Sequence, residues 1–126
     1  MPLTRIDLRK GKPAEFKKAL MDGIYEVMRE TFDVPEDDRF MTIVEHDGTT
    51  FSFGRTYLGI DRSDDLLIIQ ITANNTRTVE EKKALYARMV RRLAASPGVR
   101  PQDVFVSIVE VAKENWSFGN GLAQYA

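Results

Sequence analysis

The first residues of the chain carry the most reactive group in the sequence. Pro2 follows Met1 directly, and a residue as small as proline favours removal of the initiator methionine. The chain would then begin with the secondary amine of Pro2. An α-amino group has a pKa of roughly 7.7–8.0, and burial among apolar groups lowers that pKa, so this amine could act as a base near pH 7. The alternative is structural, because proline also suits the first position of a strand.

Other residue types that commonly do chemistry are scarce. His46 is the only histidine and there is no cysteine, so the sequence gives no basis for a zinc site. His46 follows a predicted strand and precedes a turn that contains Gly48, and we interpret it as a solvated loop residue. The sequence contains no glycine-rich phosphate loop and no nucleophile elbow. We therefore expect a function that needs no metal and no cofactor.

The charge balance and the length limit the class of protein. The 126 residues include 18 basic and 19 acidic side chains, and the net charge of −1 gives no basis for binding nucleic acid or an anionic membrane. One or two local arginines could still bind a small anionic substrate. No leader and no apolar run near the ~18 residues of a membrane helix are present, so we expect a cytoplasmic protein. The length predicts a single domain over 1–126.

The chain contains an internal duplication with an offset of 65 positions. Lys17-Lys18-Ala19-Leu20 recurs as Lys82-Lys83-Ala84-Leu85. Six further residues recur at the same offset: Val34, Asp38, Phe40, Ile43, Val44 and Glu45 correspond to Val99, Asp103, Phe105, Ile108, Val109 and Glu110. One register held over so many matches indicates two repeats, about 1–60 and 61–126. Pro2 falls opposite Leu67, so the strands that contain them are equivalent elements.

Each repeat is predicted to form a strand, a helix and a strand. Apolar residues at helical spacing predict a first helix over 14–32, with Pro13 at its start. Thr78 and Glu81 form a capping-box pattern before the second helix, which the sequence Ser96-Pro97-Gly98 ends. The predicted strands are the N-terminal segment, 40–45, 66–72 and 104–111. We expect an α/β (α+β) fold, with a four-stranded mixed sheet and both helices on one face.

The face of the sheet without helices needs a cover. The strand 66–71 is apolar on both faces, and so short a chain has no further segment to cover the second one. We infer that other subunits cover it. The aromatic C-terminal segment 115–125 could reach out to another subunit, or it could pack on its own.

Several features together resemble the tautomerase superfamily. These are the proline after the initiator methionine, the two βαβ halves, Val34-Pro35-Glu36-Asp37-Asp38-Arg39-Phe40, Thr76-Arg77-Thr78 and Asn115-Trp116-Ser117-Phe118-Gly119. Within the superfamily the chain is most similar to the branch of malonate semialdehyde decarboxylase and its double-length relatives. The resemblance spans nearly the whole chain, and it depends on the order and spacing of the motifs rather than on any single one.

The resemblance implies a cofactor-independent homotrimer with active sites near the N-terminal prolines. Carried over by position, Pro2 is the catalytic amine, Asp38 activates water or polarises the substrate, and Arg77 binds the substrate carboxylate. Trp116 and Phe118 match the apolar wall of the substrate pocket. The decarboxylase pattern has a second arginine two positions before the first, and this chain has Asn75 at that substrate-binding position. The departure weakens the case for decarboxylation more than the case for tautomerisation.

Three functions from different classes remain open at this point. The first is a tautomerase that interconverts keto and enol forms of a small 2-oxo acid, with a neutral Pro2 amine as base. The second is a lyase, a decarboxylase or hydratase, with a cationic Pro2 amine. The third is a trimer that binds a small molecule without catalysis. Asp38 could likewise be a functional residue or simply a turn residue, like its counterpart Asp103.

Overall fold

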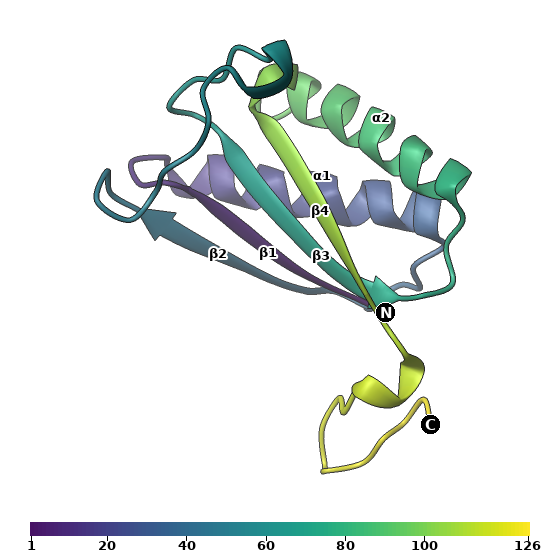
Figure 1. Ribbon diagram of the computed structural model, residues 1–126. Helices are drawn as coiled ribbons and strands as arrows, with labels where there is room; N and C mark the ends of the chain where they lie inside the picture. Colours follow the sequence, from purple (N-terminus) through teal and green to yellow (C-terminus); the bar gives the residue numbers. More distant parts are fainter.

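Two βαβ units follow one another along the chain (Figure 1). The computed structural model describes residues 1–126. Its elements, in chain order, are β1 (Pro2–Arg9), α1 (Ala14–Phe32), β2 (Phe40–His46), η1 (Tyr57–Gly59), β3 (Leu67–Asn74), α2 (Val79–Ala95), η2 (Pro101–Asp103), β4 (Val104–Val111) and η3 (Lys113–Asn115), where η denotes a short 3-10 helix. The predicted tandem of strand, helix and strand is confirmed. Neither α-helix is long and apolar enough to cross a membrane.

The four strands form one mixed sheet in the order β2-β1-β3-β4. β1 and β2 are parallel, β3 and β4 are parallel, and the central strands β1 and β3 are antiparallel. The register repeats between the halves, because Leu3 pairs with Phe40 in the first unit and Ile68 pairs with Phe105 in the second. The duplication seen in the sequence is therefore also a duplication of strand pairing.

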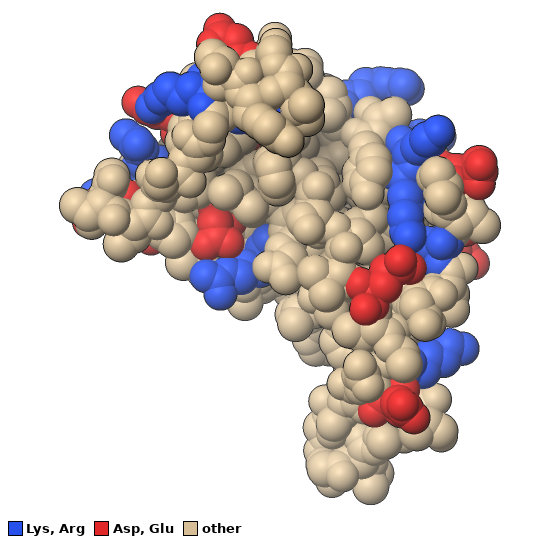
Figure 2. Space-filling view, viewed as in Figure 1, with Lys and Arg blue, Asp and Glu red and all other residues tan.

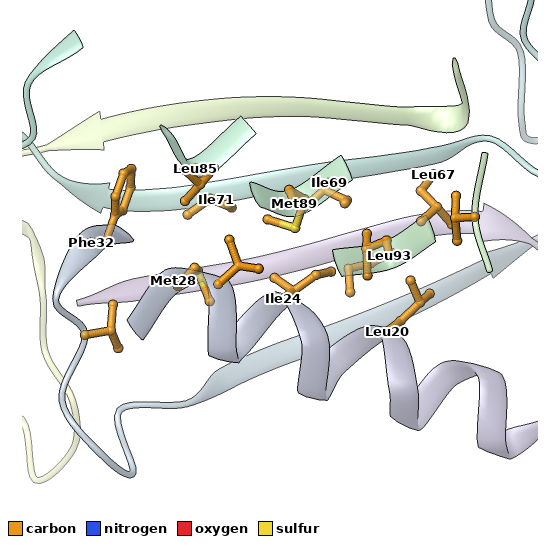
Figure 3. Packing of buried hydrophobic residues seen from close by; sticks show 14 of the residues in the cluster. Leu20, Ile24, Met28, Phe32, Leu67, Ile69, Ile71, Leu85, Met89 and Leu93 are labelled. Atoms are coloured by element: carbon orange, nitrogen blue, oxygen red, sulfur yellow. The ribbon is translucent and has the colours of Figure 1, made fainter. Parts of the chain in front are cut away.

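The core lies between the sheet and the two helices (Figure 3). Alternate residues of the central strands point towards the helices, and Ile6, Ile69 and Ile71 are fully buried there. The helices contribute residues at three- and four-residue spacing: Leu20, Ile24, Met28, Phe32, Leu85, Met89 and Leu93. Both helices thus cover the same face of the sheet, as predicted.

The two helices begin in different ways. α2 starts with the predicted capping box, in which the Thr78 hydroxyl accepts from the Glu81 amide and the Glu81 carboxylate accepts from the Thr78 amide. α1 starts after Pro13 and has no side-chain cap. Pro13 is the N-cap residue, with φ −71° and extended backbone, so the start of α1 depends on core packing rather than on a capping side chain.

The other face of the sheet is open to solvent in the single chain. Leu3, Phe40, Phe105 and Val109 project from this open face, and all four are exposed. Figure 2, drawn in the same view as Figure 1, shows few charged side chains over the strands and more of them around the margins. The open face is therefore apolar enough to be an interface.

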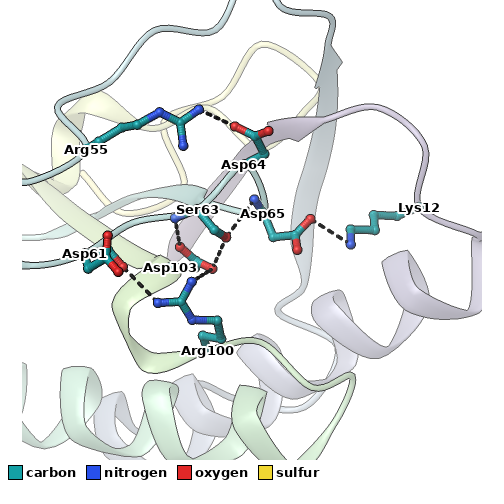
Figure 4. Close-up of polar contacts among 8 residues, drawn as sticks. All are labelled: Lys12, Arg55, Asp61, Ser63, Asp64, Asp65, Arg100 and Asp103. Atoms are coloured by element: carbon teal, nitrogen blue, oxygen red, sulfur yellow. Dashed lines mark hydrogen bonds and ion pairs between the residues drawn. The ribbon is translucent and has the colours of Figure 1, made fainter.

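A buried carboxylate joins the start of the second unit to its end (Figure 4). Asp103 is fully buried, and it accepts hydrogen bonds from the amide (2.8 Å) and the hydroxyl (2.6 Å) of Ser63. Arg100 lies 3.8 Å away and also donates to the Asp61 carbonyl. The loop before β3 is thus held against the turn before β4.

The structure corrects the interpretation of His46. It is the last residue of β2, its Nε2 lies 2.6 Å from Asp7 Oδ1, and its Nδ1 lies 3.1 Å from Thr50 Oγ1. Its ring stacks on Phe51, and only 17% of its side chain is exposed. His46 is therefore a partly buried residue that joins two strands to a loop, because the fold brings Asp7 to it from β1.

Candidate active site

The terminal amine lies in a cavity at the end of the sheet where β1 begins. The Met1 nitrogen is 3.9 Å from Asp38 Oδ2, and both side chains are largely buried. The cavity has a volume of about 640 Å³ and is lined by Met1, Asp33, Pro35, Asp38, Asn74, Thr76, Arg77, Lys113, Gln124 and Tyr125. Pro2, the next residue, is buried at the start of β1, where it pairs with Ala73 of β3.

Burial dominates the electrostatics of the amine and of Asp38. It lowers the pKa of the Met1 amine, and Arg77 and Lys113 lower it further while Asp38 opposes them. Burial also raises the pKa of the Asp38 carboxyl, against the effect of the amine and of Arg77. Since each group is shifted towards its neutral form, desolvation outweighs the attraction between them. Burial therefore favours the neutral form of the Met1 amine, which is the form that can act as a base.

One oxygen of Asp38 has no hydrogen-bond partner. Oδ1 is buried and unsatisfied, whereas Oδ2 faces the Met1 amine. The loop that carries Asp38 is held by its own backbone, with the Asp38 amide donating to the Pro35 carbonyl, and by the Asp37 amide donating to the Tyr25 hydroxyl. A buried carboxylate oxygen without a donor is costly in a fold, which is typical of a group kept for function.

Arg77 comes from the connection between β3 and α2. Its Nη2 donates to the Phe32 carbonyl at 2.9 Å, and its guanidinium lies 5.0 Å from the centre of the Phe32 ring. These contacts with the end of α1 orient the side chain, and no carboxylate pairs with it. The remaining guanidinium donors can therefore bind an anion in the cavity.

The remaining predicted site residues lie beside the cavity rather than in its lining. Asn75 is exposed, while its neighbours Asn74 and Thr76 line the cavity. The Trp116 indole donates to Asn74 Oδ1 at 2.7 Å, and its ring stacks on Phe118. In this single chain Asp38 and Arg77 line the cavity together with Met1, the residue before Pro2. Pro2, Asn75, Trp116 and Phe118 lie outside the lining, and their roles in catalysis and substrate binding stay predictions.

Sequence reasoning missed three lining residues in the C-terminal segment: Lys113, Gln124 and Tyr125. This segment leaves the sheet after β4 and folds back on itself (Figure 1). Phe118 contacts Tyr125 edge to face, and Gln124 bonds to the backbone of Phe118 and of Gly119. The aromatic residues thus form the scaffold that places polar residues at the cavity. The start of the segment packs on its own subunit, and no periodic pattern in so short a stretch could have indicated the return.

Comparison with known proteins decides the family. A family model described as tautomerase enzyme matches residues 38–119, and a second with the same description matches residues 2–60. The chain belongs to the tautomerase family. Probable tautomerase YusQ of Bacillus subtilis (strain 168) is 40% identical over 124 residues, which cover 98% of each chain. Probable tautomerase YrdN of the same organism is 37% identical over 125 residues, or 99% of this chain and 96% of that one.

Solved structures of tautomerase-superfamily proteins are also similar. Malonate semialdehyde decarboxylase has a TM-score of 0.92 and 31% identity, covering 98% of this chain and 95% of its own. FG41 malonate semialdehyde decarboxylase inhibited by 3-bromopropiolate has a TM-score of 0.91 and 36% identity, covering 98% and 93%. A fused 4-OT symmetric trimer shares the fold at 20% identity and a TM-score of 0.79, covering 98% and 97%. The resemblance to this superfamily and to its decarboxylase branch is confirmed.

Proposed function

We propose that the protein is a cofactor-independent tautomerase that interconverts the keto and enol forms of a small 2-oxo acid. The general acid and base is the amine of Pro2 after removal of Met1. One observation carries the proposal: the buried Met1 amine, directly before Pro2, lies in one cavity with the unsatisfied Asp38 carboxylate and with Arg77, which has no anionic partner. Membership of the tautomerase family agrees with it.

The residues divide the reaction between them. Arg77 binds the substrate carboxylate and thereby holds the C–H bond on the far side of the 2-oxo carbonyl towards the Pro2 nitrogen. That nitrogen removes the proton, the electrons of the C–H bond form a C=C bond, and the carbonyl becomes an enolate. The protonated amine then returns its proton to the enolate oxygen. The transfer requires an amine with a pKa near ambient pH. Burial, Arg77 and Lys113 lower the pKa of the Met1 amine, and we expect the same direction for the Pro2 amine one residue further along the chain.

Asp38 has a supporting role in this proposal. Its unsatisfied oxygen can accept a hydrogen bond from a hydroxyl of the enol form, and its charge partly offsets the effect of Arg77 and Lys113 on the amine. Its position beside the amine is the reason that we prefer function over a simple turn role.

A lyase is the second candidate. Two malonate semialdehyde decarboxylases match the fold over 98% of this chain at 31% and 36% identity. A decarboxylase or hydratase would use a cationic Pro2 amine, and Asp38 is the one group that raises the pKa of the neighbouring Met1 amine. We favour the tautomerase because burial, Arg77 and Lys113 all act in the opposite direction.

We further propose that the protein is a homotrimer. The exposed apolar residues of the open face, such as Phe40 and Phe105, give copies of the chain a surface to bury. Val109→Arg, which places a charge on this face, should convert the oligomer into monomers in sedimentation velocity. Tyr86→Arg, at an exposed aromatic residue of α2, is the control and should leave the trimer intact. A wild-type monomer at micromolar concentration would contradict the proposal.

The decisive experiment compares two forms that differ only at the terminus. Met1-free and Met1-retaining protein are assayed with phenylenolpyruvate, 2-hydroxymuconate and malonate semialdehyde. We expect ketonisation of an enol substrate by the Met1-free form and a loss of roughly 10²-fold or more when Met1 blocks the proline nitrogen. Turnover of malonate semialdehyde alone would favour the lyase. Equal activity of both forms would exclude Pro2 as the base, and a trimer without turnover would favour a binding protein.

A further inference from the structure

The first C-terminal residue at the cavity is Lys113, an exposed residue whose backbone is held in a defined position. It opens η3, two residues beyond the end of β4. The Asn75 amide donates to the Val111 carbonyl at 3.0 Å, and the Trp116 indole bonds to Asn74 on the other side of η3. The backbone of Lys113 is thereby tied on both sides to the end of β3, next to the connection that carries Arg77.

Lys113 is a cation without an anionic partner. Lys12, Lys17, Lys18 and Lys82 each have a carboxylate within 4.0 Å of Nζ, whereas Lys113 has none. The carboxylates that line the cavity, Asp33 and Asp38, lie on the opposite half of the fold, in the connection between α1 and β2. Its ammonium group is therefore available to an anion in the cavity.

Arg77 donates one hydrogen of Nη2 to the Phe32 carbonyl and one of Nη1 to the Thr76 hydroxyl, at 3.5 Å for the latter. Its planar fork binds one carboxylate with two parallel donors along one edge, and this edge does not also serve a second oxygen-bearing group of a 2-oxo acid. A second donor is needed where negative charge develops during proton removal, and Lys113 comes from a different element on the same cavity.

We propose that Lys113 is a second oxyanion-binding residue, which receives the 2-oxo oxygen of the substrate while Arg77 receives the carboxylate. The inference rests on the proposed function. As the Pro2 nitrogen takes the proton, the C=O bond becomes C–O⁻, and the Lys113 ammonium stabilises that oxygen. The protonated Pro2 amine then delivers the proton to the same oxygen, so Lys113 keeps its own protons throughout.

This role also connects Lys113 to the base. Lys113 and Arg77 lower the pKa of the terminal amine, and Asp38 raises it; Asp33 and Tyr125 are the other titratable residues of the cavity lining. The Pro2 amine of the Met1-free protein lies one residue further along the chain, so we expect removal of the Lys113 charge to raise its pKa in the same way. Because the base must be neutral in the free enzyme, the acidic limb of kcat/KM moves to higher pH.

The kinetic test compares Lys113→Gln, Lys113→Arg and Lys83→Gln in the Met1-free protein. Lys83 is an exposed residue of α2 without an ion pair, so its variant is the control. We expect Lys113→Gln to lower kcat by about 10²-fold with a smaller change in KM, and to move the acidic limb upward. Lys113→Arg should restore part of kcat and return the acidic limb of the kcat/KM profile to its original pH. An unchanged kcat and an unchanged limb in Lys113→Gln would overturn the inference and leave the tautomerase proposal intact.

A binding test separates this inference from the proposed activity. Oxalate presents two adjacent carboxylates in place of the enolate and carboxylate oxygens, and acetate presents one. In isothermal titration calorimetry, Lys113→Gln should weaken oxalate binding at least about tenfold and leave acetate binding unchanged. An inactive protein that shows this difference would refute the tautomerase while retaining the anion site. If Lys113→Gln weakens the binding of oxalate and acetate equally, or weakens the binding of neither, a second oxyanion site at Lys113 is refuted.

Discussion

Asp38 and Asp103 occupy equivalent positions in the two repeats but have opposite surroundings. Asp103 is fully buried, and both of its oxygens accept hydrogen bonds from Ser63. Asp38 is also largely buried, but one of its oxygens has no partner and burial raises the pKa of its carboxyl. The Asp103 carboxylate thus stabilises the fold, whereas the Asp38 carboxylate is retained in an environment that disfavours its charge.

Elsewhere the halves remain copies. Lys17 pairs with Glu45 in the first half at 3.1 Å, and Lys82 pairs with Glu110 in the second at 2.9 Å. The strand register repeats as well. The difference is concentrated at strand ends and connections, where a changed neighbour costs little in the core. After duplication, one aspartate could therefore remain structural while its copy became available for chemistry.

The largest expected effect is on stability at Asp103. Asp103→Asn should lower the free energy of unfolding by roughly 2–4 kcal/mol, because an amide cannot replace both accepting oxygens and leaves a buried donor of Ser63 unsatisfied. Urea denaturation followed by circular dichroism measures the loss. Asp38→Asn is the matched control and should show no such loss. Similar losses at both positions would remove the contrast between the repeats.

Arg77→Ala tests the functional side of the comparison. The variant should weaken binding of a carboxylate ligand by roughly 1.5–3 kcal/mol, because a charge-assisted hydrogen bond is lost. Calorimetric titration with acetate measures this loss. Arg91→Ala, which removes an exposed arginine of α2 without an ion pair, should bind acetate as the wild type does. Unchanged binding in Arg77→Ala would place the carboxylate site elsewhere.

The starts of the two helices offer a smaller contrast. Thr78→Ala should cost about 1 kcal/mol of stability, because the first turn of α2 loses the acceptor of its capping box. Thr78→Ser keeps the hydroxyl and should remain within a few tenths of a kcal/mol of the wild type. Thermal denaturation of both variants checks the difference, and equal melting temperatures would show that packing alone holds this turn.

The smallest effect is the pH dependence of stability at Asp38. Its folded-state pKa is raised, so the folded state binds the proton more tightly than the unfolded state does. The resulting penalty is absent below the unfolded pKa and develops as pH rises through the folded pKa. Asp38→Asn should therefore be more stable than the wild type at pH 7, by less than about 1 kcal/mol, and equally stable at pH 3. Melting temperatures at the two pH values test this, and a destabilised variant at pH 7 would contradict it.

Local patterns predicted the elements well. The bounds of α1 at 14–32 and of β4 at 104–111, and the capping box of α2, agree with the structure. The stretch 51–60 between the two units forms no strand and contains η1. These features depend on residues a few positions apart, so the sequence displays them directly. His46 was misread because its partner Asp7 is 39 residues away.

The candidate site shows the same difference between features set by neighbours in the chain and contacts between distant segments. The sequence alone determined the duplication, the four-stranded sheet with two helices, and a proline in position to provide a terminal amine. Only the tertiary structure decided that Lys113, Gln124 and Tyr125 line the cavity with Arg77 and that Trp116 and Phe118 support them. It also decided which of the two equivalent aspartates is satisfied. The physical reason is that burial and pairing depend on which distant segments meet, whereas helices, strands and caps depend on neighbours in the chain.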